Sequence, residues 1–295
     1  MALPPDDHNH SEWSWDAIAG SMEGSCARAV ELGLPSIAFT EHIDLVRWLI
    51  LPENQQAMLR GERGPVAQSM VAHLAADHRF DPPPLDVDGY LASIERCRAL
   101  FPGLRIVTGL ELGEPHLFAE QSQRLLATGA FERVLGSLHS IELDGELWEA
   151  SRLFPAWMVS NEPADLVRNY LADALQMVES SSLFAVLAHL DYPIRGWPEE
   201  AGPTSPADFA EEYRAVLRAL ARSGRALEVN TRLPLHPMIV GWWYELGGEA
   251  VTFGSDAHVP SAVGTGFAEA AAMVEAQGFR PGKAPHDFWR RALIG

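Results

Sequence analysis

The chain has 295 residues, of which 47% are hydrophobic, and a formal net charge of -18. This length accommodates one large α/β domain or two ordinary domains, and the acidic charge disfavours a long nucleic acid as a partner because a negative surface repels a phosphate backbone. No apolar run is long enough to span a bilayer, and the start lacks a basic-then-apolar signal pattern, so we expect a cytoplasmic protein with no membrane partner.

Short apolar runs alternate with segments of helical periodicity along the chain. A short strand before His8 is followed by predicted strands at 36–40, 104–109, 133–137, 184–189, 226–230 and 250–255. The apolar positions predict helices at 17–33, 87–101, 163–179, 206–222, 237–246 and 266–277. Pro163 and Pro206 are typical of first helical turns, and Gly33 and Gly224 are typical of helix ends. This alternation predicts a parallel sheet with outer helices, and seven strands fit one closed barrel over residues 1–295 better than two domains.

Residues 44–86 interrupt this alternation. They contain RGERGP and AADHRFDPPP but no clear strand. A loop of this length inside a compact domain is usually functional or mobile. Two interpretations stay open: an insertion that covers the active site as a lid, or a surface excursion with a short helix near 66–76.

Nearly every predicted strand is followed at its carboxyl end by a polar residue of a type that binds metal ions. In chain order these residues are His8, His10, Glu41, His42, Glu111, His139, His189, Asn230, Asp256 and His258. In an α/β barrel the carboxyl ends of the strands meet on one face, where active sites are built. Six of the 11 histidines follow this pattern, so we predict that they converge on a single site.

The chemistry of this set indicates a metal centre. Imidazole combined with carboxylate suits zinc, iron or manganese. His8 and His10 stand at i and i+2 on a strand end, so both side chains project to one side and can bind one ion. Glu111 could bridge two ions through its two oxygens. With Asp16 and Asp256 included, the set exceeds what one ion needs, so we predict two or three divalent ions.

The segments DDHNHSEWSWDA, AFTEHIDL, GLELGE, GSLH, LAHLDYPIR, EVNT and FGSDAH occur in this order between residues 5 and 265. Together they resemble the PHP (polymerase and histidinol phosphatase) superfamily, and within it the histidinol-phosphatase branch. Many members of the superfamily have histidine where Asp16 stands, whereas this branch commonly has an acid there.

The resemblance implies a distorted (β/α)7 barrel with a trinuclear metal centre at the carboxyl ends of the strands. The implied ligand groups are His8, His10, Glu111 and Asp256 for the first ion, Glu111, His139 and His189 for the second, and Asp16, His42 and His258 for the third.

The implied activity is hydrolysis of a small phosphomonoester in histidine biosynthesis, with L-histidinol phosphate as the first guess at the substrate. A hydroxide held between the first two ions would attack phosphorus beside Glu111 and Asp256, because metal binding lowers the pKa of water toward neutrality. Arg195 is predicted to bind the phosphate group, since its planar guanidinium can donate two hydrogen bonds to phosphate oxygens. Asp191 is expected to orient a ligand histidine. Weaker candidates for substrate contacts are Arg152, Arg232, Glu114 and His116.

Two other functions stay open. A phosphodiesterase or exonuclease could act on short nucleotides or on a nucleoside bisphosphate, which the acidic charge does not exclude. A non-catalytic metal-binding module is a further alternative, although all nine ligand positions are filled. The sequence determines neither the metal, nor the general acid, nor the oligomeric state.

Overall fold

Seven parallel strands form the centre of the molecule. The computed structural model describes residues 3–150, 158 and 161–292. Within these ranges, nine strands form one sheet in the order β1-β2-β5-β6-β9-β10-β11-β13-β12. The parallel strands are β1 (Asp6–Asn9), β2 (Ser36–Ile43), β5 (Arg105–Gly113), β6 (Arg133–Ser137), β9 (Val186–Leu187), β10 (Ala226–Asn230) and β11 (Ala250–Gly254). The strand predicted at 184–189 is thus shorter than expected, because only its two central residues pair with both neighbours.

Backbone hydrogen bonds join the first parallel strand to the chain that follows the last one. The Asp256 N–H donates to His8 O at 2.9 Å, and the His10 N–H donates to Ala257 O at 2.9 Å. Asn9 and Ala257 form a parallel bridge at the same place. The sheet therefore curls into a distorted seven-stranded barrel that closes at the carboxyl ends of β1 and β11, which confirms the predicted (β/α)7 fold.

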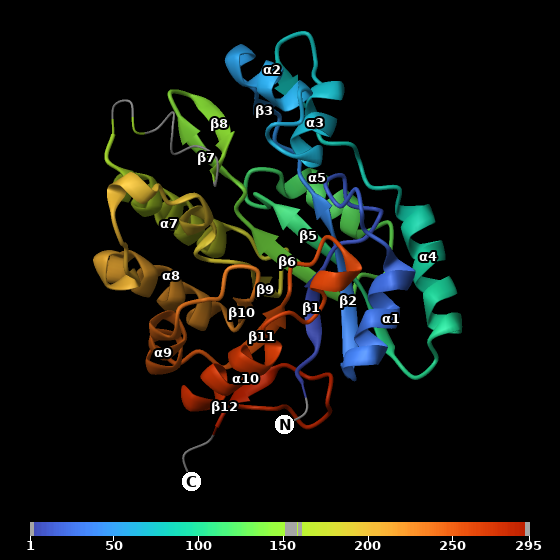
Figure 1. Cartoon of the computed structure of the whole chain (residues 1–295). Helices are drawn as coiled ribbons and strands as arrows, with labels where there is room; N and C mark the ends of the chain where they lie inside the picture. Colours follow the sequence, from blue (N-terminus) through green and yellow to red (C-terminus); the bar gives the residue numbers. More distant parts are fainter. Residues whose placement is uncertain (1–2, 151–157, 159–160, 293–295) are drawn as a thin grey trace.

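Helices surround the sheet (Figure 1). They are α1 (Met22–Leu32), α4 (Val87–Leu100), α5 (Ala119–Leu126), α7 (Pro163–Ser180), α8 (Ala210–Ser223), α9 (Pro237–Glu245) and α10 (Phe267–Ala276). The first helix starts later than the predicted residue 17, because the Ser21 side chain caps it by accepting the Gly24 N–H. Gly33 ends this helix at φ 70°, as expected from its sequence. Residues 206–209 form a 3-10 turn before α8, and α5 was not predicted. Within the described ranges, none of the helices is long and apolar enough to cross a membrane.

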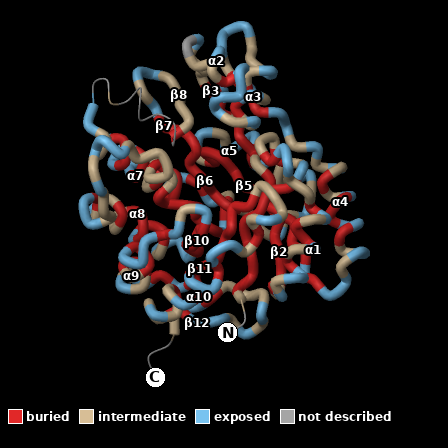
Figure 2. Tube along the Cα trace, viewed as in Figure 1, coloured by how far each residue is buried: buried red, intermediate tan, exposed pale blue. Residues whose placement is uncertain are grey.

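Burial follows the layered arrangement. In Figure 2 the strands are buried, and the exposed positions lie mostly on the outer helices and loops. Helix α9 packs Trp243 fully into the core, where its indole N–H donates to Ala250 O at 3.0 Å. Two antiparallel strands, β12 (Phe279–Arg280) and β13 (Trp289–Arg291), extend the sheet beyond β11.

Residues 44–86 form a small substructure at the end of the molecule opposite the two termini (Figure 1). It contains β3 (Trp48–Leu49), α2 (Pro52–Leu59), α3 (Pro65–Ala72) and β4 (Arg79–Phe80), and α3 corresponds to the short helix expected near 66–76. Its buried side chains form a separate cluster made of Val46, Trp48, Met58, Ala67, Met70 and Phe80.

A hairpin of β7 (Ser140–Leu143) and β8 (Glu146–Glu149) stands beside this substructure. The Trp48 indole N–H donates to the Ser140 hydroxyl at 2.8 Å, and Arg79 pairs with Glu146 at 2.5 Å. These contacts connect residues 44–86 to the chain that follows β6.

Candidate metal centre

The structure brings the nine predicted ligand residues together where the parallel strands end. The side chains of Asp16, His42 and His258 are partly exposed, and the other six are buried. The set consists of His8, His10, Asp16, His42, Glu111, His139, His189, Asp256 and His258. Because a parallel barrel points the carboxyl ends of its strands to one face, residues far apart in the sequence meet here.

Glu111 lies at the middle of the set and is fully buried. Its Oε2 faces three imidazole nitrogens, with His42 Nδ1 at 3.0 Å, His8 Nε2 at 3.2 Å and His10 Nε2 at 3.4 Å. The two Nε2 atoms of His8 and His10 are 3.0 Å apart. Two ring nitrogens that face each other and one carboxylate oxygen are arranged as ligands of a common ion would be.

The other oxygen of Glu111 faces a different pair of histidines. Its Oε1 lies 2.7 Å from His189 Nε2 and 3.2 Å from His139 Nε2. It also accepts the Ser137 hydroxyl at 2.5 Å. The two oxygens of one carboxylate are therefore directed to two separate groups of imidazoles, which is the geometry required of a bridging ligand.

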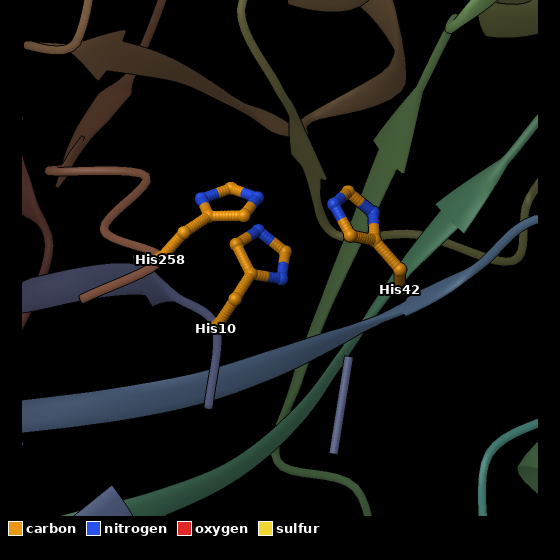
Figure 3. A group of neighbouring side chains, drawn as sticks. All are labelled: His10, His42 and His258. Carbon is orange, nitrogen blue, oxygen red and sulfur yellow. The ribbon is translucent and has the colours of Figure 1, made fainter. Parts of the chain in front are cut away.

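A third group lies nearer the solvent. Asp16 Oδ2 is 2.9 Å from His258 Nε2, and Asp16 Oδ1 is 3.5 Å from His42 Nε2. Figure 3 shows the rings of His10, His42 and His258 as neighbours that come from three different segments of the chain. The His10 ring stacks on His42 with centroids 4.0 Å apart and lies 4.4 Å from His258.

Asp256 connects the metal-ligand set to two arginines. Its backbone adopts φ 52°, in the left-handed region. Its Oδ1 is 3.6 Å from His10 Nε2 and 3.2 Å from an Arg232 nitrogen, and its Oδ2 accepts from Arg195 at 2.8 Å. The Arg195 side chain is 16% exposed, whereas that of Arg232 is 49% exposed. Arg195 is thus the more firmly held of the two.

Two buried carboxylates outside the predicted set orient two of its histidines. Asp44 Oδ1 accepts from His139 Nδ1 at 2.8 Å, and Glu228 Oε1 lies 2.6 Å from His8 Nδ1. Such partners fix the tautomer and the orientation of a metal-binding ring. Neither residue was predicted from the sequence. The available signal was a carboxylate at i+2 from His42 and a charged residue inside the apolar strand ALEVN.

The role predicted for Asp191 is wrong. Within the described residues, His189 Nδ1 has no hydrogen-bond partner, so Asp191 does not orient that ring. Asp191 instead directly precedes the 3-10 helix Tyr192–Gly196, and burial raises the pKa of its carboxyl to about 6.

The charges of the buried set stabilise one another. Burial alone would lower the pKa values of His8, His42 and His139, but neighbouring carboxylates outweigh it and hold all three well above the usual value. Burial likewise opposes ionisation of Glu111 and Asp256, yet the surrounding cationic groups hold the pKa values of both carboxyls well below their usual range.

Several atoms of this set fit a cation that would complete their bonding. Within the described residues, Glu111 Oε2, His42 Nδ1 and Asp16 Oδ1 are buried and have no hydrogen-bond partner. A buried polar atom left without a partner costs about 1–3 kcal/mol. Three groups offer ligand atoms that all lie within 4.8 Å of one another: His8, His10 and Asp256; His10, His42 and His258; and His42, Glu111 and His139. This donor set suits a divalent ion such as zinc, iron or manganese.

A cavity of about 1450 Å³ opens beside the ligand set. One side is formed by ligands such as His42 and Asp256 together with Arg195 and Arg232. The other side is formed by residues 44–86 and by the β7–β8 hairpin. The cavity is large enough for a small metabolite and is bounded by groups that can bind an anion.

Two of the three remaining predicted substrate contacts lie outside the cavity lining. Among the described residues, neither Glu114 nor His116 lines the cavity. Glu114 accepts the backbone N–H groups of His139 and Ser140 at 2.7 and 2.8 Å, and burial raises its pKa to about 7. It therefore supports the backbone next to a predicted ligand. Arg152 lies outside the described residues.

The fold and the site define an α/β barrel that binds divalent metal ions at the carboxyl ends of its strands. The sequence profile of the PHP domain matches residues 6–232, so the chain belongs to the PHP domain family.

Relatives in sequence agree with this assignment, and a solved structure shares the fold. The chain is 27% identical over 203 residues to the histidinol-phosphatase of Lactococcus lactis subsp. lactis, an alignment that covers 66% of this chain and 74% of that protein. It is 26% identical over 285 residues to a probable histidinol-phosphatase of Deinococcus radiodurans, an alignment that covers 93% of this chain and 94% of that protein. A crystal structure of the Lactococcus lactis histidinol phosphate phosphatase, complexed with zinc, L-histidinol and phosphate, superposes with a TM-score of 0.75 at 23% identity over 97% of this chain and 98% of that one.

Proposed function

We propose that this protein is a metal-dependent phosphomonoesterase that hydrolyses L-histidinol phosphate. The proposal is carried by one observation: Glu111 and eight other ligand-type side chains come together, and two arginines stand beside them on the wall of one cavity. The naming of the matched relatives as histidinol-phosphatases supports the choice of substrate. A phosphodiesterase or a non-catalytic metal-binding module is not favoured by these relatives.

Two or three divalent ions would occupy the centre, and zinc is the first candidate because the Lactococcus lactis structure contains it. Glu111 would bridge two ions, with His8, His10 and Asp256 on one side and His139 and His189 on the other. When bound, the ions polarise phosphoryl oxygens and make water a stronger nucleophile at neutral pH.

The protein's own side chains would bind and orient the ester. Arg195 lies against the Tyr192 ring at 4.9 Å and is held by Asp256, so its fork is directed along the cavity wall beside the ligands. A guanidinium placed this way can donate hydrogen bonds to two phosphate oxygens at once. The more exposed Arg232 would add a second positive charge at the mouth. These cations offset the acidic net charge of the chain for an incoming anion.

Residues 44–86 would act as a lid that separates the bound ester from bulk water. Support comes from their position: Trp48, Met58 and Met70 line the same cavity as the metal-ligand set.

The test compares metal-loaded and chelated protein on L-histidinol phosphate, p-nitrophenyl phosphate and bis(p-nitrophenyl) phosphate. Glu111→Gln, purified identically, controls for contaminating phosphatases. His73→Ala controls for the loss of a histidine outside the set, because His73 is exposed and lies in residues 44–86.

We expect turnover that is fastest with L-histidinol phosphate, abolished by chelation and by Glu111→Gln, and retained in His73→Ala. Faster cleavage of the diester would indicate the phosphodiesterase. Failure to hydrolyse any of the three substrates with zinc, iron or manganese would indicate the non-catalytic module.

A further inference from the structure

Asp44 contacts His139 but belongs to none of the three proposed ligand groups. Its side chain is 1% exposed. We propose that Asp44 is a positioning residue, through which an aromatic clamp formed by Trp15, Trp48 and Phe80 holds the His139 ring in the orientation that binds metal.

The contact between Asp44 and His139 determines which ring nitrogen is available. An ionised carboxylate only accepts hydrogen bonds, so His139 Nδ1, at 2.8 Å from Asp44 Oδ1, must carry the proton. When the ring gives up its second proton to bind metal, its lone pair lies on Nε2, which faces Glu111 Oε1 at 3.2 Å. Without this partner, the ring could adopt the other tautomer or rotate away from Glu111.

Asp44 is itself held on two sides. Its Oδ2 accepts the indole N–H of Trp15 at 2.8 Å. On the other side it packs against strand β5, where a Cβ atom placed on Gly113 would come within 2.5 Å of Asp44 Oδ1. The carboxylate therefore has little room to turn away from His139.

Trp15 in turn is fixed by the aromatic residues of the segment 44–86. Its ring centroid lies 5.0 Å from Phe80 and 5.8 Å from Trp48. Trp48 and Phe80 are cross-strand partners in the β3–β4 pair, and their rings are nearly parallel, with an interplanar angle of 10°. The Trp48 N–H takes no part in the contact with Asp44, since it donates to the hydroxyl of Ser140 instead. A continuous series of contacts thus connects residues 44–86 to His139: Trp48 and Phe80 pack on Trp15, Trp15 bonds to Asp44, and Asp44 bonds to His139.

The opposite side of the centre offers a comparison. Glu228 contacts His8 in the same way, but it lies on strand β10, and its second oxygen accepts the His189 backbone N–H at 2.7 Å. That support comes from the barrel itself. Of the two orienting carboxylates, Asp44 is the one that bonds to Trp15, whose ring packs on Trp48 of residues 44–86.

The inference rests on the proposed role of His139 as a ligand, so the experiment includes a variant that tests this role separately. Zinc affinities are measured by competition with a chromophoric chelator for wild type, His139→Ala, Asp44→Ala, Trp15→Phe and Trp48→Phe. Circular dichroism and thermal melting establish that each variant is folded. Trp15→Phe keeps an aromatic ring but removes the N–H that reaches Asp44. Trp48→Phe is the matched control. It also removes an indole N–H from the aromatic clamp, but that N–H donates to Ser140 and not to Asp44.

We expect His139→Ala to lose one zinc ion, and Asp44→Ala to bind that same ion about 10- to 100-fold more weakly. The affinity for the remaining zinc should stay unchanged in both variants. Trp15→Phe is expected to weaken the same ion roughly fivefold, and Trp48→Phe to leave it unchanged. Excess zinc should restore the kcat of Asp44→Ala.

Four outcomes would each contradict a different part of this proposal. Full zinc content in His139→Ala would refute the ligand role of His139 and with it the basis of the inference. A normal zinc affinity in a folded Asp44→Ala, beside a zinc loss in His139→Ala, would refute the positioning role of Asp44. Equal losses in Trp15→Phe and Trp48→Phe would refute transmission through the Trp15 N–H. If Asp44→Ala does not fold, a wild-type zinc affinity in Trp15→Phe refutes the proposal.

Discussion

Zinc binding to the metal-free protein is expected to release protons, and their number follows from the environment of the histidines. Neighbouring carboxylates overcome the effect of burial and hold the pKa values of His8, His42 and His139 well above the usual value. In the absence of metal, these three rings therefore keep a proton to a higher pH than a free imidazole does. A ring must lose a proton before its nitrogen can bind an ion.

Zinc binding at pH 7 is therefore expected to release protons from these three rings. Burial lowers the pKa values of His10 and His189, so these two rings are already neutral and contribute none. Because the protons compete with the metal, the apparent zinc affinity should fall as the pH decreases below 7.

The assay is isothermal titration calorimetry with zinc in several buffers that differ in enthalpy of ionisation. The dependence of the observed enthalpy on the buffer enthalpy gives the number of protons released. Glu111→Gln should release fewer, since the charge of Glu111 raises the pKa values of all three rings. His73→Ala should match wild type. A release close to zero, or the same release in Glu111→Gln, would refute the charge distribution described for the centre.

Three further predictions concern the cavity wall, a buried acid and stability. Arg195→Lys keeps the charge but loses the planar fork, so kcat/KM for L-histidinol phosphate should fall about 10- to 100-fold in steady-state assays; an unchanged value would exclude a phosphate contact. Glu114 has a folded-state pKa of about 7 against 4.5 unfolded, so the folded protein holds its proton more tightly. In chelator, the titration of Glu114 should therefore contribute a loss of about 3 kcal/mol of unfolding free energy between pH 4.5 and 7, measured by urea denaturation as the difference between wild type and Glu114→Gln. Glu114→Gln should lack this component, and identical pH profiles would contradict it. Zinc at 100 times its Kd should raise the Tm by roughly 4 °C per ion in calorimetry; no shift on chelation would argue against a structural contribution of the ions.

The barrel and the convergence of the strand-end residues of the predicted ligand set could be predicted because both depend on local patterns. Apolar runs that alternate with helical periodicity specify a parallel sheet, and residues such as His139 and Asp256 directly follow those runs. The architecture then determines that their side chains meet. The conformation of residues 11–20 was not predictable in this way, because the capping of α1 by Ser21 competes with continuation of the helix.

The orienting residues could not be predicted, because their roles depend on tertiary contacts. Asp44 has no spacing that distinguishes it from a surface aspartate, and its bond to His139 joins residues 95 positions apart. Glu228 faces the inside of the barrel only because of the register of β10 with its neighbours. The two-residue strands β3 and β4 likewise form through the packing of Trp48 on Phe80 and leave no periodic signal in the sequence.

Anomalous X-ray diffraction at the zinc edge, from crystals grown with zinc and phosphate, tests the central claim most directly. The account predicts anomalous peaks on both sides of the Glu111 carboxylate and beside Asp16, with phosphate held between the ions and Arg195. Peaks confined to other parts of the molecule, or zinc-containing crystals with no peak within bonding distance of Glu111, would contradict it.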